Sequence, residues 1–285
     1  MIKRLKTASE ARLMPDKWYV EKKFFEKTGK KLDLDNPETF SEKIQFYKLY
    51  YKDRLFPKLA DKYELKFYVE RSVGPEYVIP TEDIYTETNS LKLENLPLKF
   101  ALKATHGSGW NQVHFNHDNI TSEYLQTYFR KWLNKSYFLY SKEWAYKLIP
   151  PRIICEKLLL TKDGQLPHDY KVYCFNGKPK FILRVVRKSN DSYHDFFDTN
   201  WSLLPFNKNK LNIGETERPQ NLNEMVDIAT KLSSKIPFVR IDFYSILNKL
   251  FVGEFTFYPD SGHSLFKPIK YEYEIGNMFD LKSLE

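Results

Sequence analysis

Polar and apolar side chains alternate along two short stretches near the C-terminal end of the chain, within VRIDFYSILNKLFVGEFTFYPDSG. An alternation with a period of two places the polar side chains on one face of a strand, so this segment predicts two strands joined by a turn. If the turn is centred on Asn248, Asp242 lies opposite Glu254. The same pairing places Arg240 opposite Thr256. Like charges directly opposite one another destabilise a sheet, so the two carboxylates need a partner that offsets their repulsion.

The composition allows a large core in one big domain or two modest ones, because the chain has 285 residues and is 42% hydrophobic and 16% aromatic. Its 45 Lys and Arg against 37 Asp and Glu give a net charge of +8. Such a charge suits an anionic partner, such as a nucleotide, an acidic sugar or a lipid headgroup, although charge alone favours a solvated basic surface. The charge is spread along the chain without a basic-aromatic motif, so we expect no nucleic-acid partner.

The two cysteines, Cys155 and Cys174, lie in apolar strand-like runs and lack the spacing of a disulfide framework or a metal site. We expect both to be buried free thiols. The N-terminal sequence has no apolar signal-peptide region, and no apolar run approaches the ~18 residues that a membrane span needs. We therefore expect a cytoplasmic protein, with peripheral contact at the inner face of a membrane left open.

Helical patterns fill the chain to about residue 78, and shorter mixed elements follow. Asn36 is a candidate helix cap with Pro37 at the first helical position, and Gly74 ends a later helix. The segments YVIP, LKFALKA and RIICEKLLL predict strands, whereas TSEYLQTYFRKWLNKSY and NLNEMVDIATKLSSKI predict helices. Helices that precede a mixed set of strands indicate an α+β fold.

An Asn-Gly pair in HDYKVYCFNGKPKFILRVV predicts a β-hairpin with a two-residue turn. Pairing outward from that turn sets Lys171 opposite Ile182 and Asp169 opposite Arg184. Asp169, Lys171 and Arg184 then share one face. That face is either a solvated array of salt bridges or a cationic floor for phosphates.

A small-residue loop follows an apolar strand in LKFALKATHGSGWNQ, with Lys103 in the strand and Gly107, Ser108 and Gly109 in the loop. Such a loop lets backbone N–H groups approach phosphate oxygens, and the lysine supplies a point charge. Taken alone, such a loop is more often a simple turn.

A divalent metal would offset the repulsion in the C-terminal hairpin, because Mg²⁺ takes one or two carboxylates together with substrate phosphates. The alternative is an exposed hairpin face on which Asp242 and Glu254 pair with Arg240 and lysines.

The order of these motifs resembles the ATP-grasp superfamily. The stretches NPETFSEKIQFYKLYYKD, LADKYELKFYVER, PRIICEKLL, DYKVYCFNGKPKFI and FVGEFTFYPDSG resemble the TupA-like ATP-grasp family, whose members are encoded among bacterial surface-polysaccharide genes. The resemblance covers roughly residues 15–275. It implies an α+β ATP-grasp fold with a helical N-terminal region (1–78), a small lid subdomain (79–157) and a large subdomain with the metal site (158–285).

The resemblance also implies roles for individual residues. The residues that would bind ATP are Lys103, His106, Gly107, Ser108, Gly109, Glu156, Lys157, Lys171 and Arg184. Those that would hold Mg²⁺ are Asp242, Glu254 and Thr256, where superfamily members commonly have an asparagine in place of the threonine. The catalytic residues would be Arg240, Lys171 and Arg184, and Arg240 matches an arginine that supports the tetrahedral intermediate in D-alanine ligases. The residues that would contact the acceptor are Asp169, Arg240, Ser261, Gly262 and His263.

The implied reaction is ATP-dependent ligation of a carboxylate to an amine through an acyl phosphate, with release of ADP and phosphate. The family context suggests that an amino acid is joined to a uronic acid carried by a nucleotide sugar, a lipid-linked intermediate or a polymer. Such a reaction needs positioning and charge neutralisation rather than a nucleophilic side chain. The alternatives are a sugar kinase, a glycosyltransferase and a non-enzymatic basic binding module.

Overall fold

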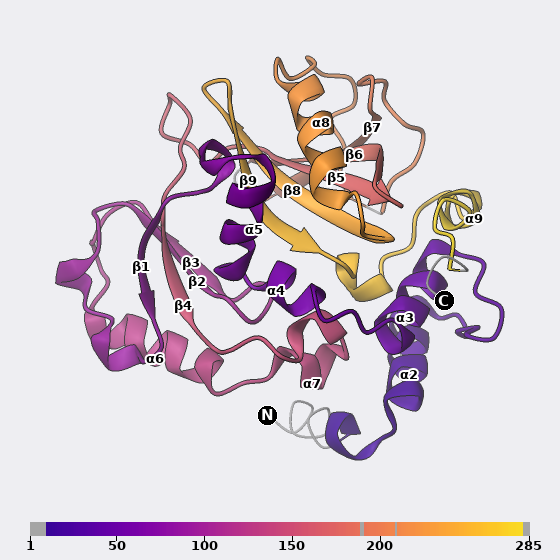
Figure 1. Cartoon of the computed structure of the whole chain (residues 1–285), viewed down its shortest axis with the longest axis horizontal. Helices are drawn as coiled ribbons and strands as arrows, with labels where there is room; N and C mark the ends of the chain where they lie inside the picture. Colours follow the sequence, from indigo (N-terminus) through magenta and orange to yellow (C-terminus); the bar gives the residue numbers. More distant parts are fainter. Residues whose placement is uncertain (1–9, 189–190, 209, 282–285) are drawn as a thin grey trace.

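The computed structural model of the chain describes residues 10–188, 191–208 and 210–281. Its strands form two antiparallel sheets with helices between and around them (Figure 1). This confirms the predicted α+β class. None of the helices in the described part of the chain has the length and hydrophobicity that a membrane crossing requires.

The smaller sheet has four strands in the order β1-β4-β2-β3. Their bounds are Thr81–Tyr85 (β1), Phe100–Ala104 (β2), Asn111–His114 (β3) and Ile153–Lys157 (β4). Helix α6 (Ser122–Leu133) buries Leu125 and Phe129 against this sheet, and α7 (Tyr137–Ser141) follows it. Thr121 caps α6, as predicted, by accepting from the Tyr124 amide at 3.1 Å.

The sequence predicted three strands in this region, of which two are confirmed as β2 and β4. The strand predicted in YVIP is wrong, because Val78 forms only an isolated bridge with Val252 and β1 starts at Thr81. Pro80 separates the two positions and has no N–H to donate to a ladder.

The larger sheet has five strands in the order β7-β6-β5-β8-β9. Their bounds are Asp169–Phe175 (β5), Lys178–Lys188 (β6), Asp191–Asp198 (β7), Phe238–Ile246 (β8) and Lys249–Thr256 (β9). Helix α8 (Leu222–Ser233) covers one face of this sheet (Figure 1) and buries Met225, Ile228 and Leu232. The chain continues from β9 through the 3-10 turn η5 (Pro259–Gly262) to α9 (Lys270–Gly276).

Helices of the N-terminal region, as far as the structure describes it, contribute to the core. They are α2 (Asp16–Thr28), α3 (Phe40–Tyr50), α4 (Phe56–Ala60) and α5 (Glu64–Val73). In Figure 1, α4 and α5 lie between the two sheets. Phe56 of α4 stacks on Phe257 with ring centroids 3.9 Å apart, so aromatic side chains join the helices to the larger sheet.

The helix predicted to begin at Pro37 begins instead at Phe40. Thr39 and Glu42 form a capping box there, in which each side chain accepts from the other residue's backbone N–H. The capping box gives a hydrogen-bond acceptor to the backbone N–H groups of Thr39 and Glu42. A helix that started at Pro37 would not have used these two contacts as its cap. Gly74 follows the last residue of α5 with a φ of 125°, and the predicted end of that helix is confirmed.

The predicted strand pairing is confirmed at the carboxylate pair of the β8–β9 hairpin but is wrong in most of the β5–β6 hairpin. In β8–β9, Asp242 lies opposite Glu254 as predicted. In β5–β6, Lys171 lies opposite Leu183 rather than Ile182, because the pairing shifts between Tyr173 and Cys174. The predicted partners on β6 are therefore wrong by one residue for every β5 position from Asp169 to Tyr173. One-residue shifts matter because they move a side chain to the opposite face of the sheet.

Candidate active site

A pocket of about 320 Å³ lies between the two sheets. Its apolar lining is Ile79, Ala101, Val113, Leu158, Leu159, Leu166 and Pro167. Its polar and charged lining is Lys103, Asn111, Glu156, Lys157, Asp169, Arg187 and Tyr244. Small-molecule sites combine a mostly apolar wall with a few polar groups that orient the ligand. Since both sheets supply lining residues, a ligand in this pocket would contact both.

Glu156 on β4 is a buried carboxylate that two lysines contact. Lys103 on β2 and Lys66 on α5 each approach one of its oxygens to 2.6 Å. Burial by itself raises the pKa of Glu156, but Lys103 and Lys66 outweigh it and lower the pKa to about 2. Two positive charges on one carboxylate leave an excess positive charge beside the pocket, which favours an anionic ligand.

The glycine loop after β2 is anchored at one end and exposed at the other. The buried Lys62 donates to the carbonyl oxygen of Gly107 at 2.7 Å. The Trp110 ring lies so close that a Cβ on Gly107 would be 2.5 Å from it. Ser108 and Gly109 are exposed. These two residues are therefore the part of the loop whose backbone is able to approach a ligand.

His106 does not line the pocket. Its side chain is buried, and its Nε2 lies 3.0 Å from the carbonyl oxygen of Trp132. The ring also makes an edge contact with Trp110. Burial lowers the pKa of His106, so the imidazole is neutral at physiological pH. The expected contact between His106 and a bound nucleotide is not supported by this position.

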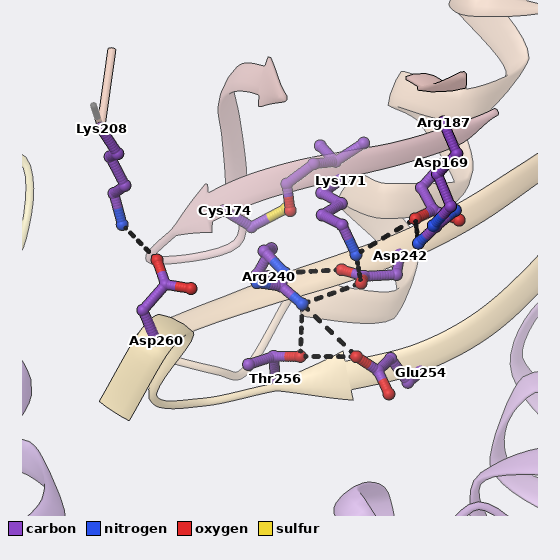
Figure 2. A network of polar contacts seen from close by, with 11 residues as sticks. Asp169, Lys171, Cys174, Arg187, Lys208, Arg240, Asp242, Glu254, Thr256 and Asp260 are labelled. Carbon is purple, nitrogen blue, oxygen red and sulfur yellow. Dashed lines mark hydrogen bonds and ion pairs between the residues drawn. The ribbon is translucent and has the colours of Figure 1, made fainter. Parts of the chain in front are cut away.

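Figure 2 shows a network of charged side chains on β5, β8 and β9, with Arg240 at its centre. Arg240 donates to both oxygens of Asp242, at 2.6 and 2.8 Å. Its Nη2 also donates to Thr256 Oγ1 at 3.0 Å and to Glu254 Oε1 at 3.4 Å. Lys171 on β5 donates to Oδ2 of Asp242. The guanidinium and the ammonium thus offset the repulsion between the two opposed carboxylates.

The pKa values of Asp242 and Glu254 are shifted in opposite directions. Burial raises the pKa of Asp242, and Arg240 and Lys171 oppose that shift only in part. Burial acts in the same direction on Glu254, but Lys62, followed by Lys171 and Arg240, lowers the pKa of Glu254 to about 2. Glu254 is therefore charged throughout the physiological range.

Asp242, Glu254 and Thr256 are the predicted Mg²⁺ ligands, and their side chains meet in this network. Two carboxylates and a hydroxyl are oxygen donors of the kind that Mg²⁺ takes. The part of the chain that the structure describes holds no group of three or more His, Cys, Asp or Glu suited to a metal. The remaining ligands would then be water and substrate oxygens, which is how Mg²⁺ is commonly held beside phosphates. The residues present fit the ion.

Arg184 lies on the other face of the sheet from Lys171. It pairs across the strands with Tyr170 and Asp195, and its Nη2 contacts Asp195 Oδ2 at 2.9 Å with both side chains buried. The expectation that Asp169, Lys171 and Arg184 share one face is therefore wrong for Arg184. The one-residue shift in β5–β6 is the cause.

Arg187, which the sequence analysis missed, lies where Arg184 was predicted, on the face of the sheet that carries Asp169 and Lys171. It donates to Asp169 at 2.6 Å and lines the pocket. Lys171 lies 3.8 Å from the same carboxylate. Asp169 thereby links the pocket to the network around Asp242. Had the pairing of β5 with β6 been shifted by one residue in the prediction, Arg187 rather than Arg184 would have been placed on the same face as Asp169.

Of the five residues predicted to contact an acceptor, Asp169 and Arg240 lie on β5 and β8, and the other three lie at the turn after β9. Gln45 donates to the carbonyl oxygens of Ser261 at 2.8 Å and Gly262 at 3.1 Å. Lys48 donates to the Ser261 carbonyl at 2.8 Å. Ser261 and His263 line a second pocket, separate from the one between the sheets.

Three lysines of the N-terminal helical region were missed by the sequence analysis: Lys48, Lys62 and Lys66. Lysines are seldom buried unless they are paired, so a lysine in a helical segment is normally assigned to solvent. The sequence did contain one signal, the four-residue spacing of Lys62 and Lys66, which would place both on one face of a continuous helix. In the structure Lys62 lies before α5, which begins at Glu64.

Comparison with known proteins matches residues 42–280 to the family model described as TupA-like ATPgrasp. A search of curated proteins finds no match to the chain. Among solved structures, the ATP-grasp ligase PsnB complexed with minimal precursor is similar at 11% identity and a TM-score of 0.44, over 80% of this chain and 62% of that one. This chain therefore spans less than two thirds of that protein.

Two further solved structures are similar. The D-alanine–D-alanine ligase from Bacillus anthracis is 15% identical with a TM-score of 0.45, over 84% of this chain and 67% of that one. The D-alanine–D-alanine ligase from Helicobacter pylori is 14% identical with a TM-score of 0.44, over 86% of this chain and 68% of that one. The family match spans far more than half of the chain, and the chain therefore belongs to the TupA-like ATP-grasp family.

Proposed function

We propose that the chain is an ATP-dependent carboxylate–amine ligase. The observation that carries the proposal is the opposed carboxylate pair Asp242 and Glu254, held by Arg240 and Lys171 beside the pocket between the sheets. Arg240 and Lys171 offset the repulsion between these carboxylates, and carboxylate oxygens beside cationic groups are what a site for Mg²⁺ and a polyphosphate requires. Membership of the ATP-grasp superfamily supports the same reading.

ATP would occupy the pocket between the sheets, with its base against the apolar wall near Glu156 and Lys157. Lys103, Lys171 and Arg187 would contact the phosphates, and the exposed part of the glycine loop would lie over them. Asp242, Glu254 and Thr256 would hold Mg²⁺, which would neutralise phosphate charge when bound.

Arg240 would contact the acceptor carboxylate and the acyl-phosphate centre. The carboxylate attacks the γ-phosphorus, the β–γ bond breaks, and ADP leaves. The amine then attacks the acyl carbon, loses a proton, and phosphate leaves. Every group that this chain would contribute orients a reactant or offsets charge.

The acceptor would be a uronic acid in surface-polysaccharide biosynthesis, and the amine an amino acid. Support comes from the family context, from the net charge of +8, and from the lysine-lined pocket beside the acceptor turn. The acceptor is either a nucleotide sugar, a lipid-linked sugar or a polymer.

The test is product analysis with a panel of uronic acids crossed with amino acids. We expect ADP and phosphate rather than AMP and pyrophosphate. Hydroxylamine with ATP and the correct acid should give a hydroxamate without any amine, because the acyl phosphate is trapped. AMP as the product would exclude the proposal. ADP together with a phosphorylated sugar hydroxyl and no hydroxamate would identify a kinase instead.

Arg187 and Arg184 provide a matched pair of variants. Arg187→Gln should weaken ATP binding about tenfold, because one charge-assisted contact to a phosphate is lost. Its unfolding free energy should change little, since the side chain is 52% exposed. Arg184→Gln breaks a buried ion pair with Asp195 and should lower the unfolding free energy by about 3–5 kcal/mol.

The folded fraction of Arg184→Gln should bind ATP as the native protein does. Calorimetric titration with ATP and thermal unfolding measure the two effects. Loss of ATP affinity in Arg184→Gln, with Arg187→Gln unaffected, would restore the role predicted from the sequence and contradict this assignment.

A further inference from the structure

A second pocket, of about 370 Å³, lies between α2, α7 and the turn that follows β9. Two of its wall residues connect it to segments of the candidate active site. Ser261 in its wall lies five residues after Thr256, one of the candidate metal ligands. Tyr137 in its wall makes an edge contact with the ring of Trp110, which follows the glycine loop, with centroids 5.5 Å apart. The pocket is therefore built in part from segments that also carry residues of the candidate active site.

Three lysines line the pocket, and no acidic residue is among its described lining. Lys48 is 2% exposed and donates to Oγ of Ser261 at 3.0 Å. Lys23 pairs with Glu26 at 2.8 Å. Lys27 forms no ion pair within the described residues. Positive charge therefore exceeds negative charge on the pocket wall.

The pKa of His263 indicates the same excess of positive charge. Burial, together with Lys48, Lys27 and Lys23, lowers the pKa of His263 to about 3, so its ring adds no positive charge. Its Nε2 is buried and has no hydrogen-bond partner among the described residues. Buried polar atoms normally have a partner, so the unpaired Nε2 indicates a polar group that the described residues do not supply. Burial lowers the pKa of Lys48 to about 8 and raises the pKa of the neighbouring Glu143 to about 7, so the positive charge of the wall comes mainly from Lys23 and Lys27.

Tyrosines complete the wall of the pocket. Tyr19 on α2 is buried and donates to the carbonyl oxygen of Tyr140 at 3.1 Å. Tyr137 and Tyr140 come from α7. Tyrosines offer an apolar face and a polar end. Aromatic faces beside clustered cations suit a ligand that has both a ring and an anionic group.

We propose that this pocket binds a phosphate group carried by the sugar acceptor. The identity of the ligand as an acceptor rests on the proposed function. The reacting carboxylate has to lie beside Arg240 and the γ-phosphate, so the anion held here is a second one on the same molecule. Lysine ammonium groups act as point charges that suit phosphate, whereas the planar fork of arginine matches a carboxylate in two contacts. The family match starts at residue 42. Helix α2, which carries Lys23 and Lys27, therefore lies outside the matched region.

The test is calorimetric titration with glucose 1-phosphate, in the presence of ADP and Mg²⁺ to fill the ATP pocket. The native protein should bind it, and the double variant Lys23→Gln/Lys27→Gln should bind it about tenfold more weakly, because two nearby charges are lost. Both lysines lie on a surface helix, so the fold should persist. The matched control is Lys17→Gln/Lys30→Gln, which removes the same charge from α2 and the residues after it but outside the pocket. It should bind as the native protein does.

Three results would overturn the proposal: no binding of glucose 1-phosphate by the native protein, equal binding by both double variants, or tighter lysine-dependent binding of glucuronic acid than of glucose 1-phosphate. The assay involves no turnover. Lysine-dependent binding in a protein that forms no hydroxamate would therefore support the pocket assignment and reject only the ligase proposal.

Discussion

Asp242→Asn is expected to lower the rate of Mg²⁺-dependent ADP release by about 10³-fold or more, and to destabilise the protein as well. The rate falls because a charged metal ligand is lost from the site that neutralises phosphate charge. Stability falls because Arg240 and Lys171, which both contact Asp242, keep their charges in a buried setting. Removing one partner of a buried ion pair lowers the unfolding free energy by about 3–5 kcal/mol.

Glu254→Gln separates the two effects. Its side chain is 34% exposed and lies 3.4 Å from Arg240, so its unfolding free energy should fall by about 1 kcal/mol or less. Its activity should nevertheless fall as steeply as that of Asp242→Asn, because a second metal ligand is lost. Thermal unfolding and ADP release at saturating ATP measure the two quantities.

Asp195→Asn is the control for stability. Asp195 is as buried as Asp242 and also pairs with an arginine, Arg184, on the other face of the sheet. It should destabilise the protein while the folded fraction keeps its turnover. Full activity in Asp242→Asn and Glu254→Gln would reduce both residues to structural partners of Arg240.

The sequence analysis placed the opposed carboxylates correctly, although its turn was not centred where expected. Leu247 and Asn248 form a two-residue turn, both with positive φ. The pairing then shifts by one residue beyond Phe243, which restores the predicted partner of Asp242. The extra residue is Gly253, where a Cβ would lie 2.9 Å from the Tyr244 ring. A glycine inside a strand is a signal of such a bulge.

The same feature in the other hairpin caused the error at Arg184. Pro179 lies opposite Cys174, and the pairing shifts immediately beyond them. Proline has no N–H to donate, so it is found in strands at edges and bulges. Its position near the turn was visible in the sequence, but the size of the shift depends on how both strands pack, which residue types alone do not determine.

The fold class, most helices and the pairing of Asp242 with Glu254 could be predicted, because hydrophobic periodicity and the order of the motifs indicate them. The buried lysines could not. Lys62 reaches Gly107 and Lys66 reaches Glu156 only because α5 and the segment before it lie between the two sheets. Such contacts depend on how distant segments meet, and a single sequence contains no local pattern that reports them.

Arg240→Lys should lower kcat by roughly 10²–10³-fold while ATP affinity changes little. The native guanidinium contacts Asp242 through two nitrogens and reaches Thr256 and Glu254 from one of them. A lysine keeps the positive charge but not the planar fork, so it would not bridge two oxygens of a forming intermediate. Loss of one such stabilising contact corresponds to a rate effect of about this size.

The matched control for Arg240→Lys is Arg187→Lys, at an exposed position where the charge matters more than the geometry. Arg187→Lys should keep its kcat within about threefold, because a point charge still serves a phosphate. Steady-state kinetics at saturating ATP, together with calorimetric titration of ATP, separate the two roles. If Arg240→Lys lost ATP affinity but kept its rate at saturating ATP, Arg240 would be a nucleotide ligand. A selective loss of kcat instead supports its contact with the reacting carboxylate, because ATP binding precedes the step that this contact would accelerate.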